Sequence, residues 1–264
     1  MDPRQNHRPT SIEEPETVRP ATIDDLKGTE LYRDLSDAAI EQSLSTSRIC
    51  SLETGQRLYT TRDEIDYLYI IEQGYVSIWT RSYFNPDDEV FLAFRGPDQI
   101  LGELRGLGDP PSNTEIRACD HCEFIEIRLD SFLDLAASNC FLYRNIAYMI
   151  LRKMWHEGQR SEVVQTTLVR RRLAKTLIHL AQDRVPNFSL DDTEVKIPGT
   201  LHQDELGFYA GTGRHSVNIV LNRLKAQGVI DFDGVNKASE ITICKLQDLL
   251  QIIRQPPPPR KKKR

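Results

Sequence analysis

Residues 202–230, HQDELGFYAGTGRHSVNIVLNRLKAQGVI, indicate the fold of the C-terminal part of the chain. Their apolar positions and glycines predict two short helices that cross at a tight turn, with a strand after them. Leu206 and Tyr209 would seat the first helix, and Gly211 permits the left-handed backbone of the turn. The apolar face of the second helix is formed by Val217, Val220, Leu221 and Leu224. This arrangement is typical of a helix-turn-helix.

The opposite face of the second helix is polar and starts at the N-terminal end, where a recognition helix meets the edges of DNA bases. No acidic residue lies between Glu205 and Asp231, so this surface would meet phosphate without local repulsion. The pattern favours binding to double-stranded DNA; the alternative is an amphipathic helical hairpin in an ordinary core. The residues expected to contact DNA are Gln203, Arg214, His215, Ser216, Asn218, Arg223 and Lys237.

Two apolar runs, residues 228–232 and 240–243, follow the second helix and predict strands around a polar turn. Lys237 lies in that turn and could add a phosphate contact that carries no sequence information. The whole region therefore predicts a winged helix-turn-helix. Upstream, the arginine run at residues 170–172 opens another helix, where it would either touch phosphates or form a solvated helix start.

The N-terminal half contains short alternating runs separated by turn residues, which favour a small antiparallel β-roll over a parallel α/β core. The expected strands are residues 57–59, 67–71, 75–79, 90–94 and 124–127. With the helical C-terminal half, this pattern predicts the α+β class.

These motifs resemble the cyclic AMP receptor protein and fumarate-nitrate regulator (CRP/FNR) family over roughly residues 25–250. Residues 201–206 and 211–217 resemble its first helix and its turn and recognition start, while residues 54–56 and 71–76 resemble turns of its cyclic-nucleotide-binding domain. The resemblance implies a homodimeric transcription regulator on a pseudopalindromic site, with RNA polymerase as a candidate partner. Arg214 matches the family arginine, whereas His215 and Ile219 replace its usual glutamate and a later arginine.

Residues 98–104 resemble the start of the family's phosphate-binding cassette, in which backbone N–H groups cradle a cyclic phosphate and a glutamate holds the ribose. Two departures follow: Ser112, Asn113 and Thr114 stand where nucleotide-binding members present an arginine and a hydroxyl residue, and Glu157 stands in place of the adenine-contacting hydroxyl pair. The residues assigned to this effector pocket are Gly102, Glu103, Leu104, Arg105, Ser112, Asn113, Thr114 and Glu157.

The altered pocket argues against the family's ordinary cyclic AMP binding, so no cofactor is assigned and the pocket would be empty, repurposed or vestigial. A cyclic nucleotide or a cyclic dinucleotide remains the candidate effector. Cyclic di-GMP is one alternative, with Arg105 or Arg160 on its phosphates; the more ordinary interpretation of Arg105 is an arginine that faces solvent. Another is a ligand-sensing or interaction protein whose DNA-reading surface has drifted, as His215 and Ile219 would suggest.

Residues 131–166 predict a long helix with an apolar stripe, which resembles the family's dimerisation helix; packing within one chain is the alternative. The stripe consists of Leu142, Ile146, Met149, Ile150, Met154 and Val164. The expected organisation is a disordered tail (1–22), a β-roll effector domain (23–135), a dimerisation helix (136–166), a winged helix-turn-helix (167–254) and a proline-rich basic tail (255–264). Such a basic tail would raise nonspecific DNA affinity; a nuclear localisation signal is its other interpretation.

Composition sets the remaining limits. The chain has 264 residues, 39% of them hydrophobic, and a net charge of −5, enough for two modest cores. No apolar run is long enough for a membrane and no signal-peptide pattern begins the chain, which predicts a cytoplasmic protein without a membrane partner. No catalytic motif appears, so we expect no enzyme and no catalytic residue.

The five cysteines are scattered and odd in number, as expected for reduced thiols. Cys119 and Cys122 form a C-x-x-C pair around His121, which could be half of a metal or redox site, but their position between strands favours a structural role. No cysteine precedes Cys50, whereas the family's oxygen-sensing branch holds iron–sulfur with an N-terminal cysteine cluster. We therefore expect no metal site.

Overall fold

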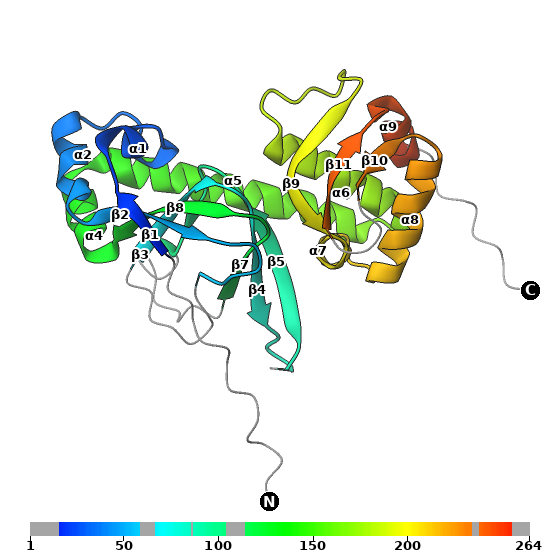
Figure 1. Ribbon diagram of the computed structural model, residues 1–264, viewed down its shortest axis with the longest axis horizontal. Coiled ribbons are helices and arrows are strands. Elements are labelled where there is room, and N and C mark those ends of the chain that lie inside the picture. The colour runs from blue at the N-terminus through cyan, green and yellow to red at the C-terminus, as the bar shows by residue number, and fades with distance from the viewer. Residues whose placement is uncertain (1–15, 59–66, 86, 104–113, 234–237, 255–264) are drawn as a thin grey trace, which may run out of the picture. The chain divides into compact units, whose positions relative to one another are not determined.

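The computed structural model describes residues 16–58, 67–85, 87–103, 114–233 and 238–254. The chain divides into two compact units, one of residues 1–89 and 94–146 and the other of residues 90–93 and 147–264 (Figure 1). The α+β class predicted from the sequence is confirmed, because the first unit is a β-roll with helices and the second carries the helix-turn-helix.

The first unit is built on two antiparallel sheets. One has the strand order β1-β2-β8-β3-β6 and the other β5-β4-β7. Buried apolar side chains from both sheets, among them Ile71, Val76, Ile116 and Phe124, form its core. The strands are β1 (Glu16–Pro20), β2 (Ser47–Leu52), β3 (Tyr67–Gln73), β4 (Val76–Arg81), β5 (Glu89–Arg95), β6 (Ile100–Leu101), β7 (Thr114–Ala118) and β8 (Cys122–Arg128). Residues 90–93 of β5 are counted with the second unit. Its helices are α1 (Ile23–Lys27), the 3-10 helix η1 (Glu30–Tyr32), α2 (Asp37–Leu44) and α4 (Leu129–Ser138).

Residues 1–22 were expected to be a disordered tail, but the structure has a strand, β1, within this range. Within residues 1–22, β1 pairs antiparallel with β2, so that Arg19 lies opposite Ile49. The Arg19 guanidinium donates to both carboxylate oxygens of Asp25, at 2.6 and 2.8 Å, and Asp25 also closes a capping box with Thr22 at the start of α1. Backbone pairing and this charge-assisted contact order a strand whose sequence lacks an alternating apolar pattern.

The predicted long helix is two helices. α4 ends at Ser138 and α5 (Cys140–Gln165) begins two residues later, because Asn139 leaves the helical backbone and its side chain accepts a hydrogen bond from the N–H of Phe141 at 3.1 Å. The predicted stripe also differs, since Leu142, Ile146 and Met149 are already buried within the chain. These three side chains are therefore unavailable to a second copy.

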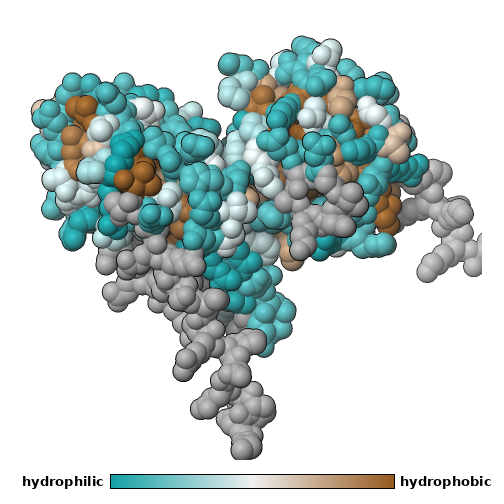
Figure 2. Space-filling view, in the orientation of Figure 1, coloured by the Kyte–Doolittle hydropathy of each residue, from teal (hydrophilic) through white to brown (hydrophobic). Residues whose placement is uncertain are grey.

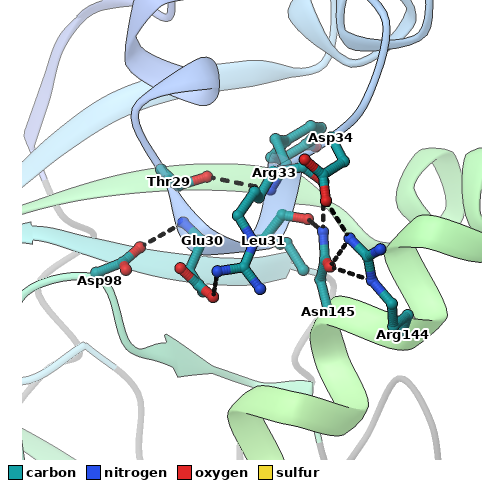
Figure 3. Close-up of polar contacts among 9 residues, drawn as sticks. Thr29, Glu30, Leu31, Arg33, Asp34, Asp98, Arg144 and Asn145 are labelled. Atoms are coloured by element: carbon teal, nitrogen blue, oxygen red, sulfur yellow. Dashed lines mark hydrogen bonds and ion pairs between the residues drawn. The ribbon is translucent and has the colours of Figure 1, made fainter.

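Asn145 anchors the N-terminal half of α5 to η1 (Figure 3). Its side chain is 1% exposed, and its Nδ2 donates to the carbonyl oxygens of Leu31 and Arg33 at 2.9 and 2.8 Å. The neighbouring Arg144 donates to Asn145 Oδ1 and to the Asp34 carboxylate on the surface. One buried amide thus satisfies two carbonyls at the end of η1 that no helix hydrogen bond reaches.

The second unit holds a small sheet, β10-β11-β9, and the helices around it. Its elements are α6 (Val169–Arg184), β9 (Val195–His202), α7 (Gln203–Tyr209), α8 (Arg214–Ala226), β10 (Ile230–Phe232), β11 (Ala238–Ile243) and α9 (Leu246–Arg254). The two wing strands were predicted from the sequence, whereas β9, which pairs with β11, was not. Lys237, assigned to the wing, lies outside the described residues.

Candidate DNA-reading surface and effector pocket

Helices α7 and α8 meet as a helix-turn-helix, with Leu206 and Tyr209 of α7 and Val217, Leu221 and Leu224 of α8 buried. Gly211 has φ of 58°, the left-handed backbone that the sequence predicted for the turn. Gly207 packs closely against the turn: its carbonyl accepts from the N–H of Thr212 at 2.8 Å, and a Cβ at this position would lie 2.8 Å from the Thr212 carbonyl oxygen. The turn therefore requires glycine at two positions.

The exposed side of α8 begins with Arg214 and His215 and continues one turn later with Ile219, which is 54% exposed. The first turn of α8 contains no acidic residue. Arg214 forms an ion pair with Asp204 of α7 at 3.5 Å, with both side chains about half exposed. Such a loose, solvated pair holds the guanidinium over the start of α8 while leaving it able to reach an acceptor in a groove.

Three amides form a chain across this surface. Asn218 Nδ2 donates to Gln203 Oε1 at 3.2 Å, and Asn222 Nδ2 donates to Asn218 Oδ1 at 2.9 Å. Gln203, expected to contact DNA, is only 6% exposed. The structure therefore places Gln203 behind Asn218, where it orients that amide.

The arginine run that opens α6 is divided among three elements. Arg170 donates to Gln227 Oε1 at 2.9 Å, Arg171 to the carbonyl oxygen of Ile253 at the end of α9, and Arg172 to the carbonyl oxygen of Gly211 in the turn at 2.8 Å. The run was expected to be a phosphate contact or a solvated helix start. Two of its three guanidinium groups instead cap backbone carbonyls, which α-helix ends and turns leave without internal partners.

Arg223 is exposed in the last turn of α8, near Arg170. Burial lowers the pKa of Arg170, and the positive charge of Arg223 lowers it further. Two neighbouring cations repel each other, so a phosphate placed between them would relieve that repulsion. The phosphate contact expected of Arg223 stays a prediction.

Four of the residues assigned to the effector pocket from the sequence are described in the structure: Gly102, Glu103, Thr114 and Glu157. Gly102 has φ of 87°, and Glu103 is 8% exposed. Thr114 begins β7, and Glu157 lies half-buried on α5. Leu104, Arg105, Ser112 and Asn113 lie outside the described residues. The role of Glu103 in the cassette stays a prediction.

Arg160, one of the two arginines considered for a cyclic dinucleotide, is already engaged within the second unit. Its guanidinium donates to the carbonyl oxygens of Leu92 and Phe91 at 2.8 and 3.3 Å and lies over the rings of Phe91 and Tyr209. A phosphate would have to displace these contacts, so the geometry gives Arg160 a packing role.

The C-x-x-C pair is buried. Burial raises the pKa of the Cys122 thiol to about 12, and its Sγ lies 3.3 Å from the carbonyl oxygen of Tyr75. A thiol held protonated in this way is a poor metal ligand and nucleophile. Among the described residues no group of three or more His, Cys, Asp or Glu side chains is arranged for a metal ion.

A ladder of charged and titratable side chains links α5 to α6. Lys175 bonds Glu162 at 2.6 Å, and His156 Nε2 lies 3.5 Å from Asp183. His179 lies between these pairs, and its buried Nδ1 has no hydrogen-bond partner in the described structure. Burial lowers the pKa of His179; Lys175 and His156 lower it further, while Glu162 opposes them.

We expect this histidine to weaken the fold in acid. Because its pKa is lowered in the folded chain, the unfolded chain takes up the proton first, and stability falls as the pH drops below about 6.5, the ordinary value. Urea unfolding of wild type and His179→Gln between pH 8 and pH 5 should give curves that diverge below that value, the wild type losing more. Substitution of the exposed His121 by Gln is the control, and parallel wild-type and His179→Gln curves would contradict the expectation.

The described surface turned to the viewer in Figure 2 is largely hydrophilic, with apolar atoms in small separate patches. Among the described helices, none has the length and apolar composition needed to cross a bilayer.

Two protein-family models match the chain. The model of the cyclic nucleotide-binding domain matches residues 49–139, and the model of the Crp-like helix-turn-helix domain matches residues 171–252. The chain belongs to the CRP/FNR family. This CRP/FNR protein is therefore a DNA-binding transcription regulator and not an enzyme.

Individual relatives agree with the assignment. The cyclic AMP receptor protein of Thermus thermophilus is 22% identical over 206 residues, 78% of this chain and 89% of its own. FixK2 from Bradyrhizobium japonicum has the same fold, with a TM-score of 0.63 at 17% identity over 80% of this chain and 99% of FixK2. The c-di-GMP-responsive global regulator CLP of Xanthomonas campestris gives a TM-score of 0.60 at 19% identity over 78% of this chain and 99% of CLP.

Two residues of the CRP/FNR helix-turn-helix were not singled out from the sequence, Asn222 and Gly207. Asn222 follows Asn218 by one helical turn, so helical periodicity could have placed it on the exposed side. Gly207 is an isolated glycine inside a helix, a signal of close packing.

Proposed function

We propose that this regulator binds a pseudopalindromic DNA site as a homodimer, with α8 of each copy in a major groove. The observation that carries the proposal is the exposed, acid-free start of α8, where Arg214 and His215 stand beside an oriented Asn218. Arg214 would bind a guanine through two hydrogen bonds, His215, Ser216 and Asn218 would contact neighbouring bases, and Arg223 would contact phosphate.

The homodimer is supported by a second stripe on α5. Tyr148, Leu151, Met154 and Trp155 are exposed, and Trp155 reaches 68% exposure. The positions 148, 151 and 155 share one helix face, so that the stripe is continuous. Exposed large apolar side chains in such a row mark an association surface. A symmetric contact between two copies would give the two-fold geometry of a pseudopalindromic site.

For the organisation of the chain, we assign the effector domain to residues 23–135, the dimerisation helix to 136–166 and the DNA-binding domain to 167–254. The division of the described chain into two units, with α5 contributing to both, supports this assignment. RNA polymerase remains the proposed partner at promoters.

The proposed effector pocket departs from cyclic AMP binding. Glu103 is buried and stands where the family's glutamate would hold the ribose, but the sequence supplies Ser112 and Asn113 where an arginine would neutralise phosphate. A cyclic dinucleotide is the alternative effector, as in the c-di-GMP-responsive relative CLP. Because Arg160 bonds backbone carbonyls, this alternative depends on Arg105.

Selection of genomic DNA fragments with the purified protein tests the proposal, with and without a panel of cyclic mono- and dinucleotides at one near-physiological salt concentration. Enrichment of a pseudopalindrome is the expected result, and dependence on one nucleotide would identify the effector. Enrichment of an isolated half-site would contradict the dimer. Binding without sequence enrichment would favour a drifted reading surface.

On the selected duplex, Arg214→Ala should weaken binding by about 1–3 kcal/mol, or roughly 5- to 150-fold, because one bidentate guanine contact is lost. Fluorescence anisotropy titrations on duplexes with each half-site base varied would measure the affinity and the base preference together. Arg128→Ala, which removes an exposed arginine of the first unit, is the charge-matched control. An equal loss of affinity on every sequence would make Arg214 a phosphate contact.

A further inference from the structure

We propose that Ile219 selects a thymine in each half-site by contact with its 5-methyl group. This inference rests on the proposed DNA-binding function and adds a base identity that hydrogen-bonding residues do not specify. Its basis is the position of a large apolar side chain within a polar, cationic surface.

Ile219 has no role in the core of the second unit. The buried side of α8 is complete with Val217, Leu221 and Leu224, each no more than 2% exposed, whereas Ile219 is 54% exposed. An isoleucine left in water loses the favourable free energy that burial would give it. The side chain is therefore available to a partner that covers this side of the helix.

The surroundings of Ile219 point to DNA as that partner. Arg214 and His215 lie at the start of the same exposed side, and Arg223 lies one turn after Ile219. Asp204 pairs with Arg214 and offsets part of its charge, and Asp231 pairs with Lys225 at the end of the same helix. A surface with an excess of positive charge around one apolar side chain complements DNA, whose negatively charged phosphate backbone borders each groove.

In the major groove, the apolar group that identifies a base is the thymine methyl; the other edge groups are hydrogen-bond donors and acceptors. Isoleucine has neither donor nor acceptor, so it can gain only from that methyl group and would leave the polar edge of another base without a partner. The adjacent Asn218 does not cover Ile219, because its amide is held between Gln203 and Asn222. Asn218 and Ile219 therefore present an amide contact and an apolar contact side by side.

The test replaces thymine by uracil, which differs only by the methyl group. Each thymine of the selected half-site is changed in turn, symmetrically in both halves, and binding of wild type, Ile219→Ala and Ile219→Val is measured by anisotropy at one salt concentration. We expect one position at which uracil weakens wild-type binding about three- to tenfold. At that position Ile219→Ala should bind both duplexes equally, and Ile219→Val, which keeps a branched methyl, should retain part of the preference.

Two results would overturn the inference: equal wild-type affinity for thymine and uracil at every position, or an undiminished uracil penalty in Ile219→Ala. Thermal melting of the two variants should match wild type, because the side chain is exposed, and this controls for misfolding. Failure of the proposed function looks different, since no duplex would then be preferred by the wild type and there would be no half-site to vary.

Discussion

Replacement of Gly207 by Ala should disable the helix-turn-helix. The added Cβ would lie 2.8 Å from the Thr212 carbonyl oxygen and 3.4 Å from the backbone nitrogen of Arg214. These are backbone atoms, so the turn itself must move, and overpacking of this kind costs about 1–3 kcal/mol. Because α8 starts at Arg214, the displacement reaches the reading surface, and we expect specific DNA affinity to fall at least tenfold by anisotropy.

The control is Gly213→Ala, six residues along the same segment. A Cβ at Gly213 has no other atom within 4 Å, and φ of −79° suits any residue. Thermal unfolding should place Gly213→Ala within about 0.5 kcal/mol of wild type, since only a small capping preference changes. If Gly207→Ala were as stable as Gly213→Ala and bound the selected duplex normally, the turn would not need glycine at 207.

Replacement of Asn145 by Ala should destabilise the first unit strongly while leaving its apolar core intact. It removes the side chain that donates to the carbonyl oxygens of Leu31 and Arg33 (Figure 3). The bond to Leu31 is buried and the bond to Arg33 is part-buried, so we expect a loss of about 2–4 kcal/mol. Urea unfolding followed by tryptophan fluorescence would measure this loss of stability. A Trp155→Phe background leaves the buried Trp79 as the fluorescent reporter.

Arg144→Ala provides the comparison at the neighbouring position. Its guanidinium pairs with Asp34 at 2.6 Å, but both side chains are about half exposed. An ion pair in water contributes little, so this variant should lose no more than about 1 kcal/mol. Equal losses for the two variants would mean that the surface charges, rather than the buried amide, secure η1.

The helix-turn-helix could be predicted from the sequence because its signals are local. The apolar spacing of α8, the left-handed Gly211 and the wing strands each follow from a few adjacent residues. Four of the five expected β-roll strands correspond to β3, β4, β5 and β8 for the same reason. In the fifth expected strand, residues 57–59, the backbone of Arg57 forms an isolated β-bridge with Arg117, and residues 59–66 lie outside the described chain.

Features that depend on distant partners could not be predicted. β1 is ordered by pairing with β2 and by the contact between Arg19 and Asp25, neither of which leaves a periodic pattern. The division of the arginine run depends on where the ends of α9 and α7 come to lie. The sequence likewise could not show that Leu142, Ile146 and Met149 are buried within the chain while Tyr148, Leu151 and Trp155 are exposed.

The two sides of α8 have different evolutionary freedom. Substitution at His215 or Ile219 changes no buried contact, so a descendant could acquire a new set of target promoters one residue at a time without compensating changes in the core. Asn218 is less free, because its amide is shared with Gln203 and Asn222. We expect divergence of target genes among descendants to follow positions 215 and 219 singly, and positions 203, 218 and 222 as a coupled group.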